Sequence, residues 1–342
     1  MKTIRIAEPN ISATDIDAVM KCLKETQLSG RSPIVKEFEQ AFAKRVGRRF
    51  AIAVNSGTSA LFLSLKGLGI KSGDEVIVPD FAFIAVPNAV SHTGAIPKLT
   101  DVEPFTYNLN ANKIVITPKT KAIIVVHTYG HPANWDKIRE KAYLYNIPII
   151  EDAAEALGAT YNGRPIGSLG MVSCFSFFAN KTMTTGEGGM VVTDNEELYR
   201  EMYLLKDQYR TTGYTHDGIG YNLNMGAMQA ALGLSQLSRL DEFLAKKAHI
   251  AKRYRTELGI CPIVMDYATH SWWMYAIEAK FELQGVELRP EFLPIHKQKP
   301  YLQDGDFKIS ERIKLTCLPI STTMTDDEQT FIIKQIKRAI VD

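Results

Sequence analysis

One lysine of this chain is placed where its amine could do covalent chemistry. Residues 174–190 read CFSFFANKTMTTGEGGM, so an aromatic-rich apolar run leads to Lys181 and a glycine-rich segment follows it. The run predicts a buried strand. Beside apolar walls a lysine favours its neutral, nucleophilic form, which can form a Schiff base with a carbonyl, including the aldehyde of pyridoxal phosphate. The alternative is a lysine that ends a strand and extends its head group into water.

Acidic residues upstream of the lysine favour the first interpretation. Two isoleucines precede Glu151 and Asp152, and Glu155 follows. The isoleucines predict a buried strand, and open α/β sheets bind their ligands at the carboxyl ends of the strands. A carboxylate placed there can keep the pyridine nitrogen of pyridoxal phosphate protonated, which makes the ring an electron sink. Asp152 alone would suit the N-cap of a following helix equally well, but Asp152 together with Lys181 favours the cofactor.

A third segment has the features of a phosphate site. A short strand at 51–54 is followed by Gly57, Thr58 and Ser59 and then by a predicted helix that continues to Leu68. Glycine permits close approach of the backbone, and the first amides of a helix are unpaired, so an anion can bind there. Such strand–glycine–threonine–helix turns are common and often purely structural.

Together these segments resemble the DegT/StrS-type sugar-nucleotide aminotransferases, a family of fold-type I pyridoxal phosphate enzymes. The resemblance is carried by EDAAE at 151–155, by the FSFF…K run and by GEGG at 186–189, and it extends from about residue 4 to residue 301. It implies a Schiff base on Lys181, Asp152 at the pyridine nitrogen, Glu155 at the phenolic oxygen and Phe83 flat against the ring. It also implies a phosphate site made of Gly57, Thr58, Ser59, Ser176 and, from the second subunit of a homodimer, Asn222.

The resemblance further implies a transaminase with two substrates. L-glutamate would donate the amino group, and a nucleotide-linked 4-keto-6-deoxy sugar, GDP-linked in the nearest likeness, would accept it on the way to surface polysaccharides such as the O-antigen. The substrate-facing candidates are Arg31, Asn180, Glu187, His296 and Tyr301. Arg31 is equally consistent with a solvated loop residue, and His296 with a structural one. Asn224 stands where the family usually has arginine, which removes a charge from the expected phosphate or nucleotide clamp.

Three other functions compete with this one. The same chemistry could act on a dTDP- or UDP-linked keto sugar, at C4 or at C3. A pyridoxal phosphate sugar dehydratase is disfavoured because relatives of that kind lack the lysine. A non-catalytic sensor or binding module would have lost its cofactor residues, whereas here they are all in place. A dinucleotide-binding protein would need Gly-x-Gly-x-x-Gly after an early strand, and none follows Val54.

Composition narrows the class of protein. The chain has 342 residues, a formal charge of +2 and 23% charged residues of both signs, which gives no support to nucleic-acid binding. Its four cysteines are far apart, and His127 and His131 have no acidic or thiol residue at ligand spacing, so neither disulfides nor a metal site are expected. No apolar run is long enough to span a bilayer, and the first residues lack a signal region. A cytoplasmic protein without membrane contact is expected.

Alternating strands and helices predict the fold class. Apolar strands at 51–54, 75–79, 96–99, 122–126, 149–152 and 190–193 are separated by helical patterns, which is typical of an α/β fold with a mostly parallel, doubly wound sheet. An Asn162-Gly163 pair predicts a hairpin turn. A long charged helix begins near Asp241, so we expect a large cofactor-binding domain at 1–240 and a smaller α+β domain at 241–342.

Overall fold

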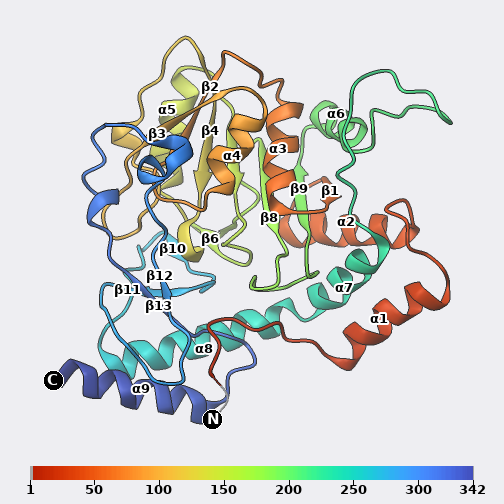
Figure 1. The fold of residues 1–342 in the computed structure, drawn as a ribbon. Coiled ribbons are helices and arrows are strands. Elements are labelled where there is room, and N and C mark those ends of the chain that lie inside the picture. Colours follow the sequence, from red (N-terminus) through yellow and green to blue (C-terminus); the bar gives the residue numbers. More distant parts are fainter. Residues whose placement is uncertain (1–2, 342) are drawn as a thin grey trace.

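A seven-stranded sheet forms the centre of the molecule in the computed structural model, which describes residues 3–341 (Figure 1). The strand order is β1-β9-β8-β5-β4-β2-β3. Every neighbouring pair is parallel except those of β9, which runs antiparallel to both β1 and β8. The expected mostly parallel sheet is therefore confirmed. In spatial order the strands are β1 (Phe50–Val54), β9 (Gly189–Thr193), β8 (Val172–Ser176), β5 (Ile149–Asp152), β4 (Thr120–Val126), β2 (Glu75–Pro79) and β3 (Ile96–Thr100).

Helices cover both faces of this sheet because its strands are apolar on both sides. Successive side chains of a strand point to opposite faces, and in β1 Ile52 and Val54 join one apolar cluster while Ala51 and Ala53 join the other. The first cluster packs against α3 (Gly57–Gly67), α4 (Ala85–His92) and α6 (Glu196–Lys206). The second packs against α2 (Pro33–Val46), α5 (Trp135–Leu144) and α7 (Ala227–Ser238). α1 (Ala13–Lys24) packs against α7.

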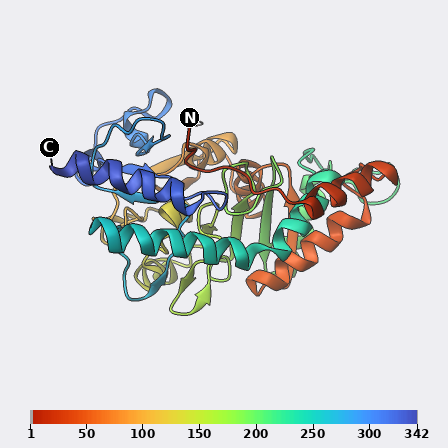
Figure 2. The same ribbon diagram turned by 90° about the horizontal axis from the view of Figure 1, so that it is seen from below.

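A smaller unit follows the long helix α8 (Leu240–Leu258). Its three-stranded antiparallel sheet has the order β11-β13-β12. Figure 2, which views the molecule from below, shows α8 and α9 side by side. Ile250 and Tyr254 of α8 share a buried cluster with residues of α9 and of the small sheet. The division at residue 240 stays a prediction. The strands of this smaller sheet and the last helix of the chain are β11 (Tyr275–Ile277), β12 (Arg289–Pro290), β13 (Thr316–Leu318) and α9 (Asp326–Val341).

The short elements complete the fold. The predicted hairpin forms, with Asn162 and Gly163 at φ values of 46° and 76° between β6 and β7, as a two-residue turn requires. Within residues 3–341, no helix combines the length and the apolar character that a bilayer crossing needs. The remaining strands are β6 (Thr160–Tyr161), β7 (Arg164–Pro165) and β10 (Ala268–Thr269), and the single-turn 3-10 helices are Ala111–Lys113, Thr128–Gly130, Ile295–Lys297, Lys299–Tyr301 and Ser310–Arg312.

Two helices were not anticipated from the sequence. α4 is short and carries Pro87 in its first turn, where proline is tolerated because the amide has no partner inside the helix. α9 has an amphipathic pattern in which Ile332, Ile333 and Ile336 are buried. The pattern of α9 could have been recognised from the spacing of its isoleucines, whereas α4 offers only two turns of periodicity.

Candidate active site

A cavity of about 480 Å³ lies where the ends of the central strands meet the start of α3. Its wall includes the last residues of β4, β5 and β8 and the first residues of α3. This is the position at which open α/β sheets bind their ligands. Nine of the residues singled out from the sequence line it: Gly57, Thr58, Phe83, Asp152, Glu155, Ser176, Asn180, Lys181 and Glu187.

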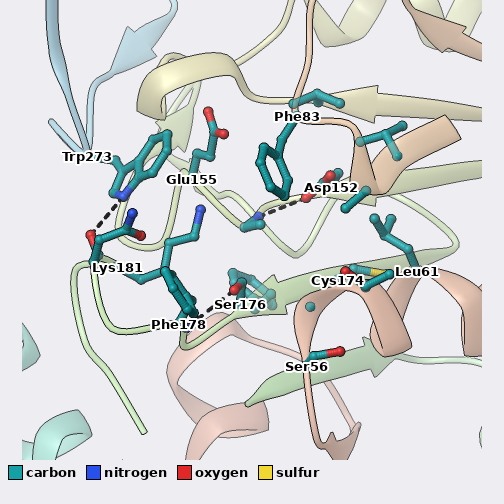
Figure 3. A pocket seen from close by; sticks show the side chains of 18 of the residues that line it. Ser56, Leu61, Phe83, Asp152, Glu155, Cys174, Ser176, Phe178, Lys181 and Trp273 are labelled. Atoms are coloured by element: carbon teal, nitrogen blue, oxygen red, sulfur yellow. Dashed lines mark hydrogen bonds between the residues drawn. The ribbon is translucent and has the colours of Figure 1, made fainter. Parts of the chain in front are cut away.

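The amine of Lys181 lies inside the cavity instead of extending into water. The lysine follows β8 in a turn, and its amide donates to the carbonyl of Phe178 at 2.9 Å. Its Nζ lies 3.9 Å from the centre of the Trp273 ring, and Figure 3 shows it pointing toward Glu155. Burial lowers the pKa of Lys181 from its usual value, although the carboxylates of Glu155 and Asp152 oppose the change. A fraction of neutral amine is therefore available for nucleophilic attack.

Asp152 ends β5 with its carboxylate at the cavity, and its neighbour Glu151 faces the other way. The Asp152 Oδ1 accepts one hydrogen bond, from the amide of Ala154 at 3.0 Å. Burial raises the pKa of Asp152, while the Ala154 amide and the Lys181 charge counteract part of this rise. No helix begins after Asp152 in the described chain, which continues in turns, so the alternative of a helix N-cap does not apply. A buried carboxylate with so few partners suits a cationic ligand group.

Glu155 provides a second carboxylate at the same end of the cavity. Its Oε2 accepts a hydrogen bond from the amide of Tyr129 at 2.7 Å. Burial raises the pKa of Glu155 to about 7, and the charge of Lys181 limits the rise. The side chain can therefore hold or release a proton near neutral pH.

The start of α3 forms a cradle for an anion. Gly57 begins the helix, and a Cβ at this position would lie 2.8 Å from the Cβ of Ser176. Only glycine therefore lets the first turn approach the end of β8 this closely. The first amides of α3 are not used by the helix itself and suit a phosphate. The hydroxyl of Ser59 is turned away from the cavity and donates to Asn55 Oδ1 at 2.6 Å, so Ser59 does not line the wall.

These residues fit pyridoxal phosphate. The cradle suits its phosphate, Asp152 can face its ring nitrogen, and the amine of Lys181 can reach its aldehyde carbon. Phe83 is 57% exposed although it lies on the cavity wall. An apolar ring left uncovered in a cavity is suited to stacking against a flat ligand.

Four other candidates lie outside the cavity wall. Arg31 forms an ion pair with Asp207 at 2.8 Å, and Asn222 is exposed, with its backbone bridged to that of Asp207. His296 is buried against Phe307 and bonded through Nδ1 to Asp80 at 2.7 Å. The Tyr301 hydroxyl donates to Asn88 at 2.7 Å. In this chain, then, these four make contacts within the fold and none with the cavity.

The two histidines that invited a metal hypothesis are paired with protein atoms. His127 Nδ1 accepts from the Ala133 amide at 3.0 Å, so Nε2 carries the proton and donates to Glu151 at 3.1 Å. His131 Nε2 accepts from the Met265 amide at 3.1 Å, and burial lowers the pKa of His131 to about 4. Between residues 3 and 341, no three His, Cys, Asp or Glu side chains are grouped as metal ligands.

The sequence did not reveal that the unit after α8 contributes to the cavity wall. Its three wall residues, none of them singled out beforehand, are Trp273, Arg289 and Phe292. The segment containing Trp273 predicts a strand, which says nothing about the surface that its ring faces. Arg289 lies in the two-residue strand β12, which is too short for a recognisable pattern.

The fold and the cavity define the class: a fold-type I enzyme with a cavity, lined by a lysine and two carboxylates, that fits pyridoxal phosphate. A family model matches residues 9–337, and the chain belongs to the DegT/DnrJ/EryC1/StrS aminotransferase family. It is a pyridoxal phosphate-dependent sugar-nucleotide aminotransferase.

Named relatives agree with this assignment. The chain is 41% identical over 344 residues to a GDP-perosamine synthase of Caulobacter vibrioides, covering 93% of each sequence. It superposes on DesV of S. venezuelae with a TM-score of 0.91 and 31% identity, covering 96% of this chain and 94% of that one. The Streptococcus pneumoniae protein Spr1654 in its PLP form gives a TM-score of 0.92 at 27% identity, covering 98% of both chains.

Proposed function

We propose that the protein transfers the amino group of L-glutamate to a nucleotide-linked 4-keto-6-deoxy sugar, in the manner of a GDP-perosamine synthase. The observation that carries this proposal is the meeting of the Lys181 amine, two buried carboxylates and the α3 anion cradle around one cavity. The choice of a GDP-linked acceptor is supported by the 41% identity to the Caulobacter vibrioides enzyme. The product would serve the synthesis of a surface polysaccharide such as the O-antigen.

Each residue at the cavity has a role in this reaction. Bound pyridoxal phosphate supplies an electron sink that stabilises negative charge on the reacting carbon. Lys181 would hold the cofactor between turnovers, and its freed Nζ would carry the proton from the α-carbon of the donor to the cofactor carbon that the lysine had occupied. In the second half-reaction the same Nζ would carry a proton from that carbon to the sugar carbon that receives nitrogen. Asp152 keeps the ring nitrogen protonated, and Glu155 holds the phenolic oxygen in place.

The charges on the wall support an α-amino acid as the amino donor. Lys181 and Arg289 are the basic side chains that line this cavity within residues 3–341. Since Lys181 is used in the chemistry, Arg289 is available to bind an anion. The charge of Arg289 lowers the pKa of both Glu155 and Lys181. Arg289 therefore acts at the reacting end of the site, away from the α3 cradle. We propose that Arg289 binds the α-carboxylate of the donor.

The acceptor side has weaker support. Asn180 and Glu187 line the cavity, and Asn180 Oδ1 is buried without a hydrogen-bond partner in the described chain. A hydroxyl of the sugar would satisfy this oxygen.

A homodimer with shared sites is also proposed. Asn222 is exposed and does not line its own cavity, as expected for a residue that serves the partner. Ile16, Met20 and Leu23 form an exposed apolar stripe along α1, with exposed fractions of 42–56%. Such a stripe at helical spacing suits burial against a second copy. Arg31 would then lie near the shared interface, and a cytoplasmic location is proposed for the dimer.

One experiment tests the whole proposal. Purified protein with pyridoxal phosphate is mixed with L-glutamate and, in separate reactions, with GDP-, dTDP- and UDP-linked 4-keto-6-deoxy sugars, and the products are weighed by mass spectrometry. The GDP-linked sugar should be aminated, and K181A should give no product. If only the dTDP- or UDP-linked sugar is aminated, that sugar replaces the GDP-linked one as the proposed acceptor. If none of the three keto sugars is aminated, the proposed class of acceptor is wrong.

A further inference from the structure

Lys247 is a buried lysine that the mechanism does not use. It lies on α8, is 3% exposed, and its Nζ donates to the carbonyls of Ile320, Trp272 and Trp273 at 3.0, 3.4 and 3.5 Å. Within the described chain no carboxylate forms an ion pair with it, and burial lowers the pKa of Lys247 to about 7. A buried ammonium without a counter-ion is costly. We explain the presence of this lysine by the backbone segments that it holds in place through the three carbonyls.

The backbone next to Lys247 is sharply kinked. Trp272 has a φ of 57°, a left-handed conformation that is rare for a bulky residue and must be held by its surroundings. The kink separates two adjacent indoles. The ring of Trp272 stacks on that of His270, with 4.1 Å between the ring centres, whereas Trp273 reaches the cavity wall. Because Lys247 binds the carbonyls of both tryptophans, it stabilises the kinked form of this segment.

Trp273 in turn contacts the catalytic lysine in two ways. Its ring packs against the Lys181 amine at 3.9 Å, and its Nε1 donates to the carbonyl of Asn180 at 3.0 Å. One indole therefore fixes both the backbone before Lys181 and the position of its amine. A second, small cavity of about 10 Å³ is lined by both Lys247 and Lys181, so the two side chains lie around one common space.

We propose that Lys247 is a positioning residue, which places the Lys181 amine by holding the kink that presents Trp273 to it. The inference rests on the role of Lys181 proposed above. If it is right, removing the Lys247 donors acts on the site through Trp273 alone. A lysine that merely fastens α8 to the small sheet would act on stability whether or not Trp273 is present.

A double-mutant cycle separates these two cases. The full-length proteins are K247M, W273F, the double variant K247M/W273F and the control K252M, which removes an exposed lysine from the same helix. Turnover is measured with pyridoxal phosphate bound. Quenching of tryptophan fluorescence by acrylamide is measured before cofactor is added, so it needs no activity. If K247M does not fold, K247Q takes its place, because glutamine stays polar but its amide has only two N–H groups and cannot donate to all three carbonyls.

The expected result is a loss of turnover of about ten- to a hundredfold in K247M, since small misplacements of reacting groups have effects of this size. The same substitution in the W273F background should lower turnover by less than about twofold. Quenching should rise in K247M, because both indoles of the kinked segment lose their support, while K252M resembles the unmodified protein. Equal losses of turnover in both backgrounds, or unchanged quenching in K247M, would overturn the proposal. Absence of turnover in the unmodified protein would refute the proposed function, and the quenching of K247M would still test the positioning.

Discussion

Glu151 and Asp152 are adjacent acids of β5. We expect the substitutions E151Q and D152N, which replace each carboxylate by an amide, to have opposite effects on stability and turnover. Glu151 accepts five hydrogen bonds, from His127, the amides of Gly167, Leu169 and Gly170, and the hydroxyl of Ser173. Burial alone would raise the pKa of Glu151, but these bonds lower it to about 2. A fall from 4.5 to about 2 corresponds to about 3 kcal/mol of stability at neutral pH. E151Q should lose at least this much, because its NH₂ group meets amides that also donate.

D152N should behave in the opposite way. Burial raises the pKa of Asp152, so its charge costs stability in the protein without cofactor, and the neutral amide should leave the free energy of unfolding unchanged or slightly higher. Turnover should fall by about 10²–10³-fold, the usual effect of removing one preorganised group that stabilises charge in the transition state. Some cofactor binding should remain.

Both variants are compared by urea unfolding without cofactor and by initial rates with cofactor. E151Q serves as the control for D152N, because it changes the same strand on the face away from the cavity. We expect E151Q to retain most of its turnover under conditions where it remains folded. A D152N enzyme with an undiminished rate would refute the role given to Asp152, and an E151Q protein as stable as the original would refute the account of Glu151.

Three further predictions follow from the geometry. G57A places a methyl group 2.8 Å from the Ser176 Cβ, which forces the start of α3 away from β8, and should weaken cofactor binding at least tenfold, measured by absorbance titration. R289Q should slow the half-reaction with L-glutamate by about a hundredfold in stopped-flow absorbance and leave amination of the sugar within a few fold; the reverse pattern would assign Arg289 to the diphosphate. Mixing inactive K181A with inactive N222A should restore activity if the sites are shared between subunits, and no recovery would contradict the proposed dimer.

The sequence predicted those residues of the site that lie next to short, recognisable apolar elements. Asp152 ends a strand, Lys181 follows a strand and Gly57 begins a helix, and the sheet brings these three positions together. Parallel strands leave little freedom in this, because their carboxyl ends lie on one edge. The central sheet and most helices could be predicted for the same reason.

The remainder of the wall depends on contacts between distant parts of the chain. Trp273 reaches the cavity because the backbone reverses at Trp272 and Lys247 holds it there, and no spacing in the sequence encodes that turn. His296 shows the converse: its position in a loop suggested a sugar contact, yet its Nδ1 is bonded to Asp80 and the residue is 6% exposed. Pattern alone cannot tell a polar side chain that meets a substrate from one that meets another strand.

Burial by itself does not decide what an acidic residue does in this protein. Glu151 and Asp152 are equally enclosed, yet their pKa values move in opposite directions because one accepts five hydrogen bonds and the other accepts one. The alternation of side chains along β5 sends Glu151 into a ring of donors and Asp152 into the cavity. The first is satisfied by the protein and stabilises the fold. The second keeps unused capacity to bind a positive charge, and that capacity is what a cofactor with a protonated ring nitrogen requires.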